Sequence, residues 1–99
     1  MKEVIGLRES DVERVFCREV KRLGGWPLKL TCAGTAGMPD RLVIFPGGRC
    51  KFVELKRLRG EPRALQQLRA DQLRALGCDV ACLDSPEAVA RWMEEVIPR

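Results

Sequence analysis

Two short parts of the sequence place charged side chains at the ends of apolar stretches. Asp40 stands directly before one apolar run, and Glu54 and Lys56 stand at the end of the next. Residues two apart on a strand project from the same face, so Glu54 and Lys56 are predicted to lie side by side. A carboxylate there can hold a divalent cation, and a lysine beside it can orient a water molecule or neutralise charge on a phosphate. An ordinary salt bridge at a strand end is the alternative explanation.

The two apolar runs are predicted to form a β-hairpin. Residues 41–45 and 50–56 are rich in Val, Ile, Phe and Leu, and they flank a proline-glycine-glycine turn signal. A hairpin folds the start of its first strand beside the end of its second, which brings Asp40 near Glu54 and Lys56. Asp40 is otherwise explained as a turn residue that follows a proline.

The pairing register of this hairpin decides whether the charged side chains share a site. With a two-residue loop at the paired glycines, Asp40 falls opposite Leu55 and points away from Glu54. A shared site therefore requires an offset of one residue. We predict either a three-residue loop with a glycine bulge or a break in the ladder at Pro39.

The other elements follow from apolar periodicity and turn residues. We predict an amphipathic helix over 10–23, a short strand over 27–31, a loop over 32–38, a helix from Pro62 that Gly77 ends, a strand over 80–83, and a last helix opened by Ser85, Pro86 and Glu87. Residues 42–45 are apolar at consecutive positions, which predicts helices on both faces of the sheet. The order α-β-β-β-α-β-α predicts one α/β domain over residues 1–99.

The composition limits the chemistry available to this domain. Eighteen Lys and Arg against fourteen Asp and Glu give a net charge of +4, a mild basic excess that suits polyanions. The chain has no histidine and no glycine-rich phosphate loop, which argues against histidine-based nucleases and NTP hydrolysis. Five scattered cysteines without a secretion signal predict reduced cytoplasmic thiols, and their spacing does not favour a zinc site. No apolar run is long enough to cross a bilayer.

Basic residues gather in sequence around the charged hairpin ends. Four of them are predicted to contact DNA, namely Arg41, Arg57, Arg59 and Arg63. A solvated charged face is the alternative explanation for any one of them.

The motif G-x-P-D at 37–40, a short strand, a glycine turn and then E-L-K at 54–56 resembles the PD-(D/E)XK nuclease superfamily. The phrases MPDRLVIFPGG and FVELKRLRG are similar to those of its VRR-NUC family, in particular the small stand-alone phage-type members. The resemblance implies a restriction-endonuclease-like αβββαβ core, with a mixed central sheet flanked by helices and an additional C-terminal helix. It also implies a cytoplasmic protein of bacterial or phage origin.

The resemblance also implies roles for particular residues. Asp40, Glu54 and the backbone carbonyl of Leu55 would hold Mg²⁺ or Mn²⁺, Lys56 would be the catalytic lysine, and Glu13 and Gln66 would be the further acid and glutamine of the site. Glu13 is equally explained by a capping box that begins at Ser10. Gln67 is the alternative for the glutamine. We prefer Gln66 because it follows Pro62 at the spacing usual in the family.

The function that this resemblance implies is metal-dependent, structure-specific hydrolysis of phosphodiester bonds in branched DNA, as in four-way (Holliday) junctions. Flaps or duplex DNA are alternative substrates, and a basic nucleic-acid-binding module without catalysis is the alternative class. A two-fold homodimer is expected, since stand-alone members act as homodimers. The apolar side of the last helix, formed by Val89, Trp92, Met93 and Val96, fits either the dimer interface or the core.

Overall fold

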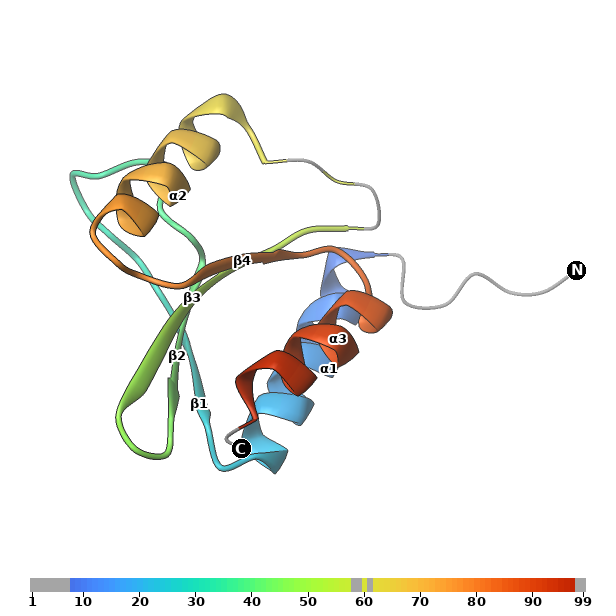
Figure 1. Ribbon diagram of the computed structural model, residues 1–99. Coiled ribbons are helices and arrows are strands. Elements are labelled where there is room, and N and C mark those ends of the chain that lie inside the picture. The colour runs from blue at the N-terminus through green and yellow to red at the C-terminus, as the bar shows by residue number, and fades with distance from the viewer. Residues whose placement is uncertain (1–7, 58–59, 61, 98–99) are drawn as a thin grey trace, which may run out of the picture.

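The computed structural model describes residues 8–57, 60 and 62–97 of the chain. Its elements are α1 (Glu9–Arg22), β1 (Trp26–Lys29), β2 (Arg41–Phe45), β3 (Arg49–Leu55), α2 (Ala64–Ala75), β4 (Val80–Leu83) and α3 (Pro86–Val96) (Figure 1). The strands form one sheet in the order β1-β2-β3-β4, antiparallel except for the parallel pair β3 and β4. This confirms the predicted mixed sheet in an αβββαβ core with an additional C-terminal helix.

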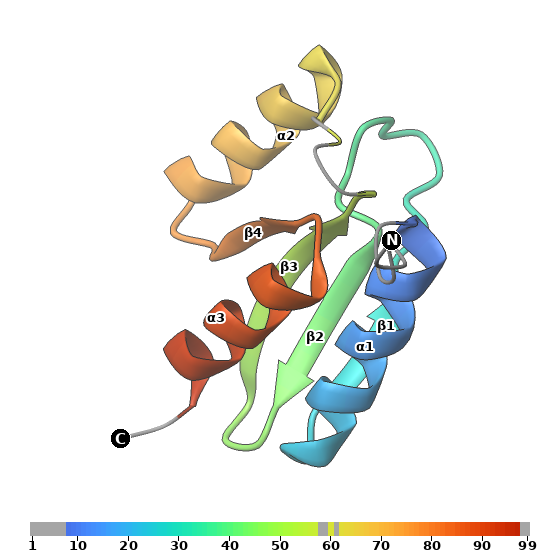
Figure 2. The ribbon, with the colours of Figure 1, turned by 90° about the vertical axis from the view of Figure 1, so that its right-hand side faces the viewer.

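The hydrophobic core lies between one face of the sheet and the helices α1 and α3, which pack side by side (Figure 2). Val12, Phe16 and Val20 recur every fourth residue on α1, so they share the helix face that is buried. Trp92 of α3 lies between two aromatic rings, with centroid distances of 5.8 Å to Phe16 and 5.9 Å to Phe45. These contacts fix the sheet that carries the charged hairpin ends.

The apolar side of α3 belongs to this core. Val89, Trp92, Met93 and Val96 are all buried within the protomer. Ser85 caps the helix, because its hydroxyl accepts a hydrogen bond of 3.0 Å from the backbone N–H of Ala88. The core explanation of this apolar stripe therefore holds, and the dimer-interface explanation is wrong.

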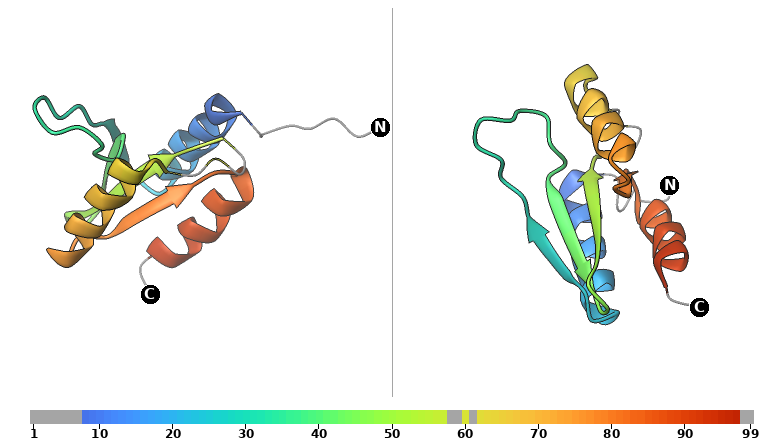
Figure 3. Two further views of the ribbon diagram at one scale, coloured as in Figure 1. Left: turned by 90° about the horizontal axis from the view of Figure 1, so that it is seen from above. Right: turned by 60° about the vertical axis from the view of Figure 1, so that its left-hand side comes forward.

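The opposite face of the sheet is covered less than the sequence predicted. Helix α2 lies beside β4, away from the other two helices, and contributes no buried residue (Figure 3). Leu42 and Ile44, which face this side, are therefore only half-buried. Trp26, directly across from Ile44 on β1, leaves 63% of its surface exposed. Helices flank both faces of the sheet as predicted, but the expectation that both faces of the strand at 42–45 are covered is wrong, because α2 lies over the β4 side.

The β2–β3 hairpin has the offset that the shared site requires. Phe45 pairs with Arg49, so the loop between them has three residues, and the N–H of Gly48 donates to the carbonyl of Phe45 at 3.1 Å. Gly47 and Gly48 adopt φ values of 88° and 75°, a region that favours glycine. Of the two predicted arrangements, the three-residue glycine loop is therefore confirmed.

Two expectations about helix ends need correction. Helix α1 begins at Glu9 with Arg8 as its N-cap, so Ser10 lies within the first turn and does not form the capping box. Helix α2 begins at Ala64, so Pro62 precedes the helix instead of starting it. Gly77 does follow the last turn of α2 with φ of 90°, as predicted.

Among the described residues, no helix combines the length and apolar character needed to cross a membrane.

Candidate metal and nuclease site

Asp40 and Glu54 lie opposite one another across the β2–β3 pair. Arg41 pairs with Val53, and extending this register by one residue brings Asp40 to Glu54. The N–H of Asp40 donates to Oε1 of Glu54 at 3.2 Å, and the N–H of Leu55 donates to Oδ1 of Asp40 at 3.1 Å. The carboxylate of Glu54 is thus held by the backbone of Asp40, and the carboxylate of Asp40 by the backbone of Leu55, the residue after Glu54. These two contacts fix both carboxylates at one end of the sheet.

Glu54 is the centre of the polar contacts at this site. Glu54 is only 8% exposed, and its Oε2 lies 3.1 Å from Nζ of Lys56 and 3.0 Å from Nε2 of Gln66. Lys56 directly follows the end of β3, two residues after Glu54, and Gln66 comes from the first turn of α2. Hairpin and helix therefore place a carboxylate, an ammonium group and an amide within contact of each other.

The environment of Asp40 disfavours its ionised form. Burial is the largest cause, the negative charge of Glu54 adds to it, and together they raise the pKa of Asp40 to about 6. The hydrogen bond from the N–H of Leu55 lowers the pKa and offsets part of this effect. Two carboxylates held this close in a partly buried place are the arrangement that a cation stabilises.

The oxygen donors present fit a hard divalent cation. Asp40 and Glu54 supply carboxylate oxygens from adjacent positions, and the carbonyl of Leu55 points toward the β2 side because its N–H does. Within the described ranges, no cluster of three or more His, Cys, Asp or Glu side chains is arranged to hold a metal ion. An ion here would therefore complete its coordination with water or phosphate oxygens, as Mg²⁺ does in many protein sites.

Glu13 and Arg41 form an ion pair on the other face of the sheet. Nη2 of Arg41 lies 2.8 Å from Oε2 of Glu13, and its Nη1 donates to the carbonyl of Pro27 at 2.9 Å. Successive residues on a strand point to opposite faces, so Arg41 points away from the side chain of Asp40. Because Arg41 is buried with these partners, its guanidinium is not on the surface where we expected it to meet DNA.

The remaining predicted residues are the glutamines of α2 and three arginines. Gln66 donates to Glu54, whereas the amide of Gln67 donates to Asp71 at 3.0 Å, so Gln66 is the glutamine that contacts the carboxylate. Arg57 and Arg63 are exposed near it, and Arg59 lies outside the described residues.

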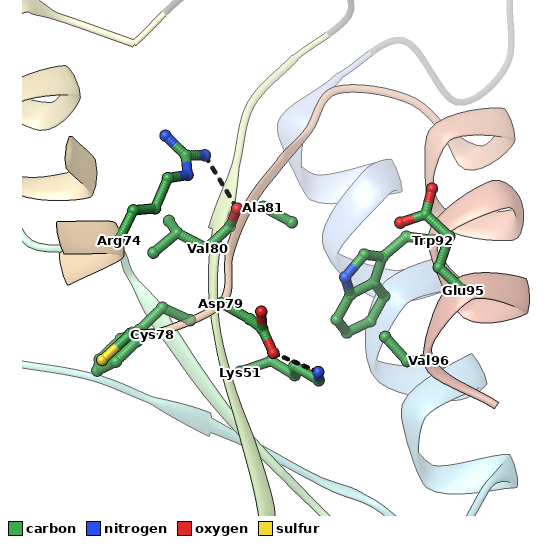
Figure 4. A pocket seen from close by; sticks show the side chains of 10 residues that line it. Lys51, Arg74, Cys78, Asp79, Val80, Ala81, Trp92, Glu95 and Val96 are labelled. Atoms are coloured by element: carbon green, nitrogen blue, oxygen red, sulfur yellow. Dashed lines mark hydrogen bonds and ion pairs between the residues drawn. The ribbon is translucent and has the colours of Figure 1, made fainter. Parts of the chain in front are cut away.

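A small pocket of about 30 Å³ adjoins the carboxylate of Glu54 and is lined in part by Pro39, Gln66 and Cys82. A larger cleft, of about 390 Å³, lies along the β4 edge between α2 and α3 (Figure 4). In that cleft Lys51 pairs with Asp79, and Nη2 of Arg74 donates to the carbonyl of Val80 at 2.9 Å. The candidate site is the group formed by Asp40, Glu54 and Lys56, and of these three residues Glu54 also lines the small pocket.

Two features of the site had no signal in the sequence. Cys82 of β4 lies directly across from Glu54, because β3 and β4 pair in parallel with that register. Arg69 of α2 donates from Nε to the carbonyl of Ala36 at 2.8 Å, which ties the helix to the loop before Asp40. A parallel register and a side-chain contact to a loop carbonyl leave no local pattern that sequence inspection could detect.

No family model matches the chain. Comparison of the fold with solved structures finds a "VRR_NUC domain" with a TM-score of 0.86 and 31% sequence identity, covering 90% of this chain and 97% of that one. Among curated proteins, "Putative nuclease p44" of Acyrthosiphon pisum secondary endosymbiont phage 1 is 38% identical over 81 residues, which is 82% of this chain and 87% of that protein. The chain belongs to the VRR-NUC family. This VRR-NUC protein matches nearly the whole length of the solved domain, so the similarity seen in the sequence motifs extends to the fold.

Proposed function

We propose that this VRR-NUC protein is an Mg²⁺- or Mn²⁺-dependent endonuclease that hydrolyses phosphodiester bonds in DNA. The observation that supports this most strongly is the pairing of Asp40 with Glu54, with Lys56 held 3.1 Å from the Glu54 carboxylate. Family membership and the name of the phage relative agree with this activity. Glu13, which pairs with Arg41 on the other face of the sheet, stays a predicted further acid and is not included among the ligands of the ion.

In the proposed mechanism, Asp40, Glu54 and the carbonyl of Leu55 would hold the cation by their oxygens. The chemistry supplied there would be that of a Lewis acid, lowering the pKa of a bound water and polarising the phosphate. Lys56 orients the attacking water and offsets the negative charge that develops on the phosphate. Gln66 donates to Glu54 and keeps this carboxylate in its orientation.

We infer that the substrate is branched DNA, as in a four-way junction. Arg57 and Arg63 are exposed beside the site and are suited to phosphate contacts, and Arg59 is expected to act with them. A two-fold homodimer would place two sites in an arrangement that matches the symmetry of such a junction.

The surface that we propose for this dimer is the open face of the sheet, with a second copy of the chain as its partner. Ile44 lies across from Trp26 and Cys50, and Leu42 lies across from Leu28 and Phe52, so none of these positions carries a charge. An uncharged face does not attract phosphate, but it is complementary to a copy of itself.

Sedimentation velocity tests this surface. Trp26→Ser is expected to convert dimer to monomer, whereas Leu76→Ser, on the exposed end of α2, is expected to leave the dimer intact, and a wild-type monomer would contradict the proposal.

The alternative is a basic module that binds nucleic acid without cutting it, with Lys56 and Glu54 as a structural ion pair. Their contact of 3.1 Å is also what such an ion pair would show. A substrate panel separates the two functions. Labelled four-way junction, flap and linear duplex are incubated with the protein in Mg²⁺ or in EDTA, and binding and cleavage are measured separately. Cleavage of the junction in Mg²⁺ alone supports the proposal, preference for flap or duplex changes the substrate, and binding without cleavage contradicts the enzyme.

A further inference from the structure

Helix α2 is positioned by hydrogen bonds, because it has little apolar contact with the rest of the protein. None of its residues is buried, and Leu65 and Leu68 are 40% and 49% exposed. Three of its side chains bond to other elements: Gln66 to Glu54, Arg69 to the carbonyl of Ala36, and Arg74 to the carbonyl of Val80. The position of Gln66 at the site therefore depends on contacts made elsewhere along the helix.

One of these contacts is a close seam between α2 and the loop that leads to Asp40. Gly37 has φ of +85°, and a Cβ built on it would lie 2.7 Å from Cγ of Leu65 and 3.2 Å from Cγ of Arg69. Only glycine allows the helix to approach the loop so closely. Beside it, Nε of Arg69 donates to the carbonyl of Ala36 at 2.8 Å, and its Nη1 donates to Oε1 of Gln72 at 3.0 Å.

We propose that Gly37 and Arg69 are positioning residues for the metal site. They hold α2 against the 36–37 loop so that the amide of Gln66 stays on Oε2 of Glu54. The seam joins the helix that carries Gln66 to the loop that carries Asp40, and the sheet holds Glu54 between them. This inference rests on the proposed nuclease function, because it assigns the seam a role in holding the carboxylate that binds the cation.

The physical basis is the orientation of a metal ligand by its hydrogen-bond partner. Oε2 of Glu54 has contacts with both Lys56 and Gln66. If α2 moves away, Oε2 of Glu54 keeps the Lys56 ammonium but loses the amide, and the carboxylate, still held at Oε1 by the N–H of Asp40, can turn toward the ammonium. Loss of such outer contacts typically weakens metal binding by about 10-fold or more.

The test compares Arg69→Met with Arg91→Met in the full chain. Both variants lose one positive charge. Arg91 is exposed on α3, which lies on the opposite face of the sheet from α2. Binding of Mn²⁺ is measured by electron paramagnetic resonance, and amide hydrogen exchange of residues 64–75 reports on the helix. Arg69→Met is expected to raise the Kd for Mn²⁺ by about 10-fold and to speed exchange in α2. Arg91→Met is expected to change neither quantity.

A second pair of variants tests the glycine. Gly37→Ala is expected to weaken Mn²⁺ binding as Arg69→Met does, and adding Leu65→Ala, which removes the clashing Cγ, is expected to restore part of it. Unchanged Mn²⁺ affinity in folded Arg69→Met, or a Gly37→Ala defect that Leu65→Ala does not relieve, would overturn the positioning role. If the wild-type protein binds Mn²⁺ but cuts no DNA in the substrate panel, the nuclease proposal fails while the seam result still stands.

Discussion

The N–H of Asp40 donates to Oε1 of Glu54 at 3.2 Å, across the first position beyond the β2–β3 ladder. This contact exists because the hairpin loop has three residues instead of two. The same offset directs both carboxylates to one face of the sheet, together with Lys56. The loop far from the site is thus what aligns the residues within it.

The two adjacent glutamines of α2 are expected to differ sharply when each is replaced. Gln66→Ala removes the donor to Glu54 and should reduce cleavage by about 10-fold or more, with a higher Mg²⁺ requirement. Gln67→Ala removes only an exposed contact with Asp71 and should leave the rate within about two-fold. Single-turnover cleavage across a Mg²⁺ titration measures both, and equal effects would contradict the assignment.

The raised pKa of Asp40 predicts a pH dependence of stability in the metal-free protein. Because its pKa is about 6 in the folded state and about 4 when unfolded, its protonated form stabilises the fold below pH 4. That contribution is lost as the pH rises from about 4 through about 6. Asp40→Asn abolishes this titration. The free energy of unfolding of the variant minus that of the wild type, both measured in urea with EDTA, should therefore rise as the pH increases from about 4 to about 6. Parallel curves for the two proteins would show that the pKa is not raised.

The hairpin loop is expected to tolerate asparagine better than alanine. A Cβ on Gly48 would meet nothing within 4 Å, so the cost of Gly48→Ala comes from its φ of +75° alone. We expect a loss of about 1 kcal/mol in the free energy of unfolding, and a smaller loss for Gly48→Asn. Metal affinity should be unchanged in both, because the register is kept. Thermal or urea unfolding measures the difference, and a larger loss for asparagine would contradict the backbone explanation.

The ion pair between Glu13 and Arg41 predicts an asymmetry in stability. The side chain of Arg41 is 8% exposed and that of Glu13 is 40% exposed. Glu13→Ala leaves a buried guanidinium without its carboxylate and should cost about 2 kcal/mol, whereas Arg41→Met removes the buried charge and should cost about 1 kcal/mol. Urea unfolding compares them. A stable Glu13→Ala protein with weakened Mn²⁺ binding would instead show that Glu13 acts directly on the ion.

Much of this architecture was predictable because its signals are local. The order of helices and strands follows from apolar periodicity, and the need for an offset at the paired glycines follows from the two-residue period of a strand. The place of Gln66 at the site came from the family motif and agrees with its contact to Glu54.

What could not be predicted depends on contacts between distant parts of the chain. The burial of Arg41 reflects the approach of Glu13 and the Pro27 carbonyl, and an arginine in sequence gives no sign of such partners. The leucines of α2 have the period of a buried helix, yet none of them is buried, and Leu65 and Leu68 remain 40% and 49% exposed. Apolar periodicity indicates which side of a helix faces the protein, but not how much of that side is covered.

The most direct test of the metal-dependent nuclease site compares two lysines of the same hairpin. Lys56 and Lys51 are similarly buried, with side chains 18% and 20% exposed, and each pairs with one carboxylate. Cleavage of a labelled four-way junction at saturating Mg²⁺ is measured for Lys56→Ala and Lys51→Ala, with junction binding measured in Ca²⁺. We predict that Lys56→Ala loses at least about 100-fold in cleavage rate while still binding the junction, and that Lys51→Ala cuts at nearly the wild-type rate. Cleavage by Lys56→Ala at the wild-type rate would contradict the site.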